Sequence, residues 1–144
     1  MRLVNRFALY ALTSALLVSL SLSQQKTQKA DKASESKTVS GYLVDKNCGV
    51  QIAKKEKQKA MEMAKKHSVA CGLDEACMAN GYCLIVDGKL IELDDNGNAM
   101  AAKYLKGLTK KNDVFVTVTG TIEGTALHVQ KIADGTPPQP GSGS

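Results

Sequence analysis

All four cysteines of this chain lie between Cys48 and Cys83, and the same stretch holds His67, one of only two histidines. The part of the chain that has a folding pattern is short, about one hundred residues, so its hydrophobic core is modest. Domains of this size gain stability from cross-links or from a bound metal ion. The clustered thiols therefore constrain the fold, because the chain has to bring them within reach of one another or of an ion.

The N-terminus has the pattern of an export signal. Arg2 and Arg6 precede an uncharged apolar run, residues 7–22, and a small-x-small motif ends at Ser23. We therefore expect a periplasmic or secreted protein, associated with a membrane only if the signal is retained uncleaved. The predicted organisation is a signal peptide (1–23), a flexible linker (24–37), one folded domain (38–133) and a disordered tail (134–144).

Strand-forming segments lie on both sides of the cysteine-rich stretch. A β-branched and aromatic run, residues 38–44, precedes it. Two apolar runs follow it, residues 82–86 and 89–93, and they flank Asp87-Gly88. This dipeptide is typical of a two-residue hairpin, because both turn positions require positive φ.

The C-terminal half predicts a helix and a second hairpin. Asn98 is a plausible N-cap for a short helix over residues 99–106. Residues 114–121 alternate, so that Val114, Val116 and Val118 share one face. The last strand is predicted at 126–132, with His128 on its outward, solvated face.

The stretch between the first two strands has a different character. Residues 51–67 are rich in lysine and lack proline and glycine, which favours a helix. Cys48 is expected to end the first strand, and residues 71–81 are irregular or form a second short helix. The fold class is therefore mainly β with short helices: a five-stranded OB-like barrel with a helical Cys/His-rich insertion between strands 1 and 2. An SH3-like barrel is the alternative.

Several short motifs occur in a fixed order along this domain. They are Gly-Tyr-Leu-Val-Asp-x-x-Cys (41–48), His-x3-Cys-x5-Cys (67–77), Gly81-Tyr82, Asp-Gly-Lys (87–89) and Val-Thr-Gly-Thr (118–121). In this pattern the chain resembles a family of small exported bacterial domains of unknown function. The resemblance implies an OB-like fold and brings no established activity or cofactor. Cys83 departs from the family pattern, which has glycine there, and gives the other cysteines an additional disulfide partner.

Three interpretations of the cluster remain open. An even number of cysteines in an exported domain is typical of disulfides, with Cys48, Cys71, Cys77 and Cys83 as candidates in any of three pairings. The function would then be that of a non-catalytic binding or envelope module, without a cofactor.

The second interpretation is a zinc or copper site. Cys48, His67, Cys71 and Cys77 form a set of three cysteines and one histidine, in which His67 and Cys71 share one face if they lie on a single helix. Asp45 is then a candidate outer partner that orients His67, and the alternative is that it caps or turns the backbone at the end of the first strand. The third interpretation is thiol redox chemistry, with His67 lowering the pKa of Cys71.

The sequence argues against two further classes of function. Both arginines lie in the signal, and the mature chain keeps few aromatic residues for stacking, so no nucleic acid partner is expected. The sequence contains no phosphate-binding glycine loop, no Gly-x-Ser-x-Gly and no His-Glu-x-x-His, so an enzyme is not indicated. The partner remains unidentified.

Overall fold

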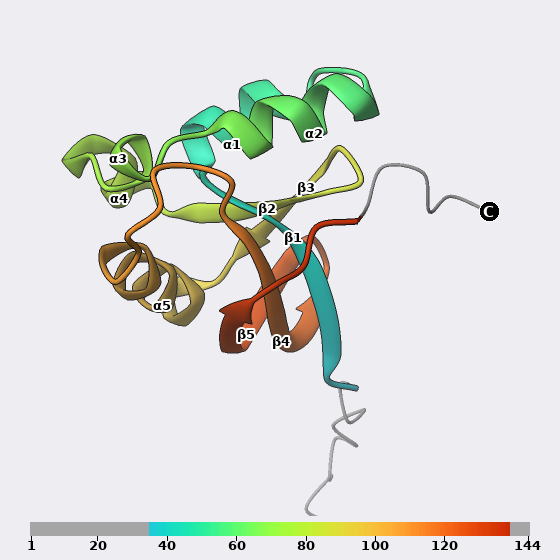
Figure 1. The fold of residues 1–144 in the computed structure, drawn as a ribbon. Coiled ribbons are helices and arrows are strands. Elements are labelled where there is room, and N and C mark those ends of the chain that lie inside the picture. The colour runs from blue at the N-terminus through green and yellow to red at the C-terminus, as the bar shows by residue number, and fades with distance from the viewer. Residues whose placement is uncertain (1–34, 139–144) are drawn as a thin grey trace, which may run out of the picture. The chain divides into compact units, whose positions relative to one another are not determined.

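The computed structural model describes residues 35–138. The predicted signal peptide, most of the predicted linker and the last six residues of the tail lie outside this range. Within it the chain forms a five-stranded sheet with short helices, so the prediction of a mainly β domain is confirmed (Figure 1). The strands are β1 (Lys37–Asp45), β2 (Tyr82–Val86), β3 (Lys89–Leu93), β4 (Phe115–Glu123) and β5 (Ala126–Asp134).

The strands are hydrogen-bonded in the order β1-β2-β3-β5-β4, and β4 also pairs with β1, so the sheet closes on itself. Four of the five pairings are antiparallel. The fifth, between β3 and β5, is parallel and rests on only two residue pairs, Glu92–Ala126 and Leu93–Leu127. The sheet is therefore mixed, and between β3 and β5 it is closed by only these two residue pairs.

The turn chemistry read from the sequence is confirmed. Asp87 and Gly88 have φ angles of 51° and 80°, as a two-residue hairpin requires. Gly88 has a second constraint, because a Cβ there would lie 2.8 Å from the Cα of Lys57. The alternation of the β4 segment is also confirmed, since Val116 and Val118 are fully buried while Thr117 and Thr119 are partly exposed.

The long helix predicted over residues 51–67 is wrong. The insertion instead contains four short helices, α1 (Lys46–Ile52), α2 (Lys57–Lys66), α3 (Val69–Gly72) and α4 (Glu75–Asn80). Three of them begin at side-chain caps, because Asp45, Ser68 and Asp74 accept hydrogen bonds from the first-turn amides of α1, α3 and α4. These caps lie outside the lysine-rich segment. The segment itself is broken between Ile52 and Lys57, where Glu56 precedes α2 without a side-chain capping bond.

The start of the last helix is also corrected. Helix α5 (Asp95–Lys106) begins earlier than predicted, with Asp94 as its N-cap through a 2.8 Å bond from the Gly97 amide. The predicted cap, Asn98, lies inside the helix. Its side chain accepts instead from the backbone N–H of Tyr82, at 2.8 Å, and so joins α5 to the start of β2.

Two groups of buried side chains hold the domain together. The larger lies between the sheet and α5 and includes Leu84, Leu105 and Leu127. The smaller lies between the sheet and the helices α1 and α2 and includes Tyr42, Val44, Ile52, Ala60, Cys83, Ile85 and Phe115. The insertion is thus packed onto the sheet. Among the described residues, no helix is long and apolar enough to span a membrane.

Candidate metal centre

Asp45 is the centre of the site. It is the last residue of β1, where it pairs with Tyr82, and it is also the N-cap of α1. Its side chain is fully buried, the only charged residue among the buried residues of the described chain. Oδ1 accepts a 2.9 Å hydrogen bond from the Cys48 amide, and Oδ2 lies 2.7 Å from Nε2 of His67. Both carboxylate oxygens therefore have partners, as burial of a charge requires.

Two thiols face this carboxylate from different helices. Cys48 lies on α1 and Cys71 on α3, and their sulfur atoms are 3.9 Å apart. Sγ of Cys71 is also 3.7 Å from Oδ2 of Asp45. Cys71 is held in place by Ser68, whose hydroxyl accepts from the Cys71 amide at 3.1 Å. The prediction that Cys48 ends the first strand is wrong, since that strand ends at Asp45.

His67 reaches the site from the end of α2. It is the C-cap of that helix and has an extended backbone, with ψ of 130°. His67 and Cys71 do not lie on a single helix, because Ser68 caps a new helix between them. The two side chains still meet. One donor atom from each of Asp45, Cys48, His67 and Cys71 lies within 4.8 Å of every other. We call these four residues the donor cluster.

The histidine and aspartate of the donor cluster are almost fully buried, whereas its two cysteines are partly exposed. The His67 side chain is 9% exposed and that of Asp45 is not exposed at all. Cys48 and Cys71 are half-buried. All four cysteines have free thiols, and the 3.9 Å between Cys48 and Cys71 is well beyond the disulfide bond length of about 2.05 Å.

The electrostatics of the site favour a protonated thiol at Cys48. Burial, then the nearby Asp45 carboxylate, raises the pKa of Cys48 to about 12. Burial also acts to raise the pKa of Asp45, but the hydrogen bond from the Cys48 amide and the nearby His67 together lower this pKa by more. The pKa of Asp45 is therefore lowered overall. Reactive cysteines need a lowered pKa. The environment of Cys48 is therefore the opposite of that of a nucleophilic or redox-active thiolate, whereas a bound cation would favour its thiolate form.

The two remaining cysteines are placed differently from each other. Cys77 lies on α4, half-buried, and is not a member of the donor cluster. Burial, followed by the charges of Asp45 and Cys71, raises the pKa of Cys77 to about 11. Cys83 lies on β2, is fully buried in the core under α1, and has its sulfur 3.9 Å from the Asp45 carbonyl oxygen.

Two residues that position the site were missed from the sequence. Ser68 caps α3, and a serine directly before a short apolar segment is an N-cap signal that could have been used. The buried Tyr82 hydroxyl donates to the Gly72 carbonyl at 2.7 Å and ties α3 to β2. No sequence pattern indicates this long-range bond.

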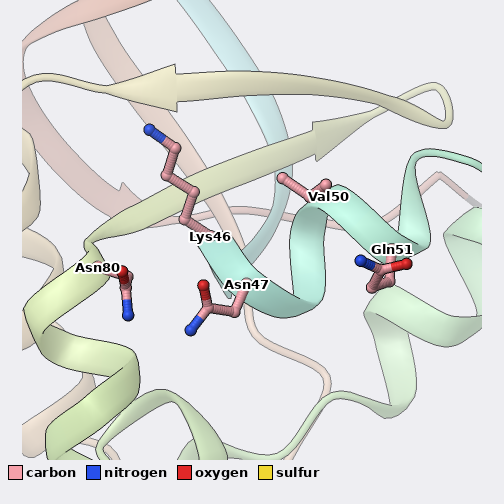
Figure 2. Close-up of a pocket in the computed structure, with 5 residues that line it drawn as sticks. All are labelled: Lys46, Asn47, Val50, Gln51 and Asn80. Atoms are coloured by element: carbon pink, nitrogen blue, oxygen red, sulfur yellow. The ribbon is translucent and has the colours of Figure 1, made fainter.

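A separate hollow lies on the outer side of α1. It has a volume of about 340 Å³ and is lined by Lys46, Asn47, Val50 and Gln51 of α1 and by Asn80 of α4 (Figure 2). None of these five side chains is a soft metal ligand or an acid, and Lys46 is already paired with Glu92 at 2.7 Å. The hollow therefore offers polar contacts but no chemistry of its own.

The second histidine is not a member of the donor cluster. His128 is on the exposed face of β5, as predicted, with 45% of its side chain exposed. It is not simply solvated, because its ring nitrogens lie 3.3 Å from Asp94 and 3.4 Å from Glu123. Ion pairs at this exposure contribute little to stability.

Comparisons of this chain with protein-family models, with curated proteins and with solved structures gave no match.

Proposed function

We propose that this chain is a small exported domain that binds one transition-metal ion, zinc or copper, at the donor cluster. The observation that carries the proposal is the convergence of Asp45, Cys48, His67 and Cys71, from four separate elements, to within 4.8 Å. Sulfur, imidazole and carboxylate are the ligands that zinc takes in proteins. Two thiolates bonded to one tetrahedral zinc lie about 3.8 Å apart, and the sulfurs of Cys48 and Cys71 lie 3.9 Å apart.

The wider interpretation of the chain is part of the same proposal. The order of the strands, the closure of the sheet and the position of the insertion after β1 support an OB-like barrel. An SH3-like barrel is the alternative. The N-terminal signal pattern supports export, and the resemblance to exported domains of unknown function is compatible with a non-catalytic binding role in the cell envelope.

The second candidate is a disulfide-stapled module without metal. It is favoured by the same short distance, since Cys48 and Cys71 need to approach by less than about 2 Å to bond. A disulfide would not account for the Asp45–His67 pair, which is buried beside the thiols at some cost in desolvation. The buried Asp45–His67 pair is therefore the reason to prefer the metal site over the disulfide.

The test is native mass spectrometry of the mature protein, purified from its export compartment without reductant or chelator. One bound zinc or copper per chain is expected. The His67→Ala variant should lose the ion, and the matched His128→Ala variant should keep it, with circular dichroism confirming that both are folded. Should His67→Ala not fold, Cys71→Ser provides the same comparison.

Two results would overturn the proposal. The first is a mass two or four hydrogens short with no adduct, which means one or two disulfides and favours the second candidate. The second is equal metal content in His67→Ala and His128→Ala, which removes His67 from the site.

A further inference from the structure

The identity of the fourth ligand decides which metal the site suits. Cys48, His67 and Cys71 are common to two possible sets. Either Asp45 completes the set directly, or Cys77 completes it while Asp45 orients His67 from outside. The position of the Asp45 carboxylate relative to the thiols distinguishes these two arrangements.

In the outer-partner arrangement, Asp45 bonds to one ring nitrogen of His67 and the metal is bound at the other. The two ring nitrogens point in diverging directions, so the metal would lie about 7 Å from Oδ2 of Asp45. A sulfur bonded to that metal at about 2.3 Å could approach Oδ2 no closer than about 4.5 Å. Sγ of Cys71 lies 3.7 Å from Oδ2. The thiol therefore lies on the same side of the ring as the carboxylate, and the outer-partner arrangement does not fit.

The direct arrangement does fit. In a tetrahedral zinc site a sulfur and a carboxylate oxygen lie about 3.5 Å apart, and the 3.7 Å between Cys71 and Asp45 matches this value. A nitrogen and an oxygen ligand lie about 3.3 Å apart, whereas Nε2 of His67 and Oδ2 of Asp45 are 2.7 Å apart. The ion would take the place of the hydrogen between these two atoms and move them apart by about 0.6 Å.

The charge of this set points to a divalent ion. Asp45 and two thiolates carry three negative charges, and His67 ligates as a neutral ring. A divalent ion leaves one excess negative charge in a shielded site, and copper(I) leaves two. A carboxylate is also a hard ligand that copper(I) does not favour.

The methionines do not supply the soft ligands that copper(I) would need. Sδ of Met61 accepts from the Gly88 amide at 3.3 Å, at the hairpin, and Met63 is exposed on α2. Neither belongs to the donor cluster.

We infer that Asp45 is a direct ligand, that Cys77 lies outside the coordination sphere, and that two cysteines, one histidine and one aspartate form a centre for a divalent ion of the zinc type. The inference rests on the proposed function. It differs from the set of three cysteines and one histidine expected from the sequence in exchanging Cys77 for Asp45.

The experiment is substitution of cobalt(II) into the folded, reduced protein. Thiolate-to-cobalt charge-transfer absorbance increases with the number of cobalt–sulfur bonds, so it counts the thiolates. We expect an intensity equal to two cobalt–thiolate bonds in the wild type and in Cys77→Ser, and a lower intensity in Cys71→Ser. A three-thiolate intensity in the wild type that falls by about one third in Cys77→Ser would overturn the inference and leave the proposed function intact. A wild type that binds neither cobalt nor zinc would instead overturn the proposed function itself.

A second measurement tests Asp45 and the metal class together. Asp45→Asn keeps the size of the side chain and an oxygen for the Cys48 amide. Loss of an outer partner costs about 10–100-fold in metal affinity, so a larger loss for zinc is expected if Asp45 is a ligand. Copper(I) affinity, measured by competition with a chromogenic copper(I) probe under anaerobic conditions, should change less than about 10-fold. Similar losses for both metals, or a zinc loss below about 100-fold, contradict the inference.

Discussion

The contact between α1 and β2 leads to a sharp prediction about stability. Gly49 of α1 packs on Cys83 of β2, and a Cβ at Gly49 would lie 2.2 Å from the Cys83 sulfur. Ordinary contacts begin at 3.4 Å, so the overlap is 3.4 minus 2.2, or 1.2 Å. The methyl group could not move aside, because Val44 and Leu90 each approach it to 3.3 Å. Gly49→Ala is therefore expected to overpack the core under α1.

The magnitudes follow from the two opposing effects. Overpacking costs about 3 kcal/mol, and alanine returns about 1 kcal/mol through helix propensity, so Gly49→Ala should lose about 2 kcal/mol of unfolding free energy. Cys83→Ala leaves a small void and should lose about 1.5 kcal/mol. Additivity predicts a loss of about 3.5 kcal/mol for the double variant. In the double variant, however, the new methyl group would occupy the space that the Cys83 sulfur leaves. We therefore expect the double variant to lose only about 1 kcal/mol of unfolding free energy.

The assay is urea unfolding of all four proteins, followed by circular dichroism, with reductant and chelator present. These conditions remove any contribution from a disulfide or a metal ion, and comparable m-values confirm that the same surface unfolds. The expected coupling energy is about 2.5 kcal/mol. A double variant whose loss equals the sum of the single losses within about 0.5 kcal/mol would show that Gly49 and Cys83 do not share this space.

Three smaller predictions concern the rest of the domain, each measured by urea unfolding. The pKa of Asp94 is lowered, since burial is outweighed by amide hydrogen bonds such as that from Gly97, so its contribution should be lost as pH falls below about 4. Asp94→Asn should flatten this acid loss, and an unchanged slope contradicts the cap. Tyr82→Phe leaves the buried Gly72 carbonyl unpaired and should cost about 1–2 kcal/mol, while a neutral effect would mean that water replaces the hydroxyl. Gly88→Ala should cost about 2 kcal/mol because φ is 80°, and a loss below about 0.5 kcal/mol would refute the strain argument.

The strands were predictable because their signals are local. The Asp87-Gly88 turn and the alternation around Val116 are contained in a few consecutive residues, and the structure keeps both. The insertion was not predictable to the same degree. Caps at Asp45 and Ser68 begin α1 and α3, but the break between α1 and α2 has no side-chain cap that a sequence pattern could have indicated.

The donor cluster shows the same division between local and long-range information. Soft ligands could be recognised in the sequence by residue type, so Cys48, His67 and Cys71 were identified as candidates. Which residue lies beside them depends on where α3 and α4 lie against the end of β1, a long-range property. In the metal interpretation Asp45 was therefore a candidate outer partner and Cys77 a candidate ligand, whereas in the structure Asp45 belongs to the donor cluster and Cys77 does not.

The partners of Asp45 also bear on how a metal would bind. In structural zinc domains the site does not exist before the metal arrives, and the apo chain is unfolded. Here each carboxylate oxygen already has a hydrogen-bond partner, and the capping, strand-pairing and packing contacts of the insertion do not require an ion. The donors are therefore held in place by the fold itself. Metal binding should then leave the far-ultraviolet circular dichroism unchanged while raising the unfolding midpoint in proportion to the logarithm of free metal. A chain that gains helix only when metal is added would contradict this view of a preformed site.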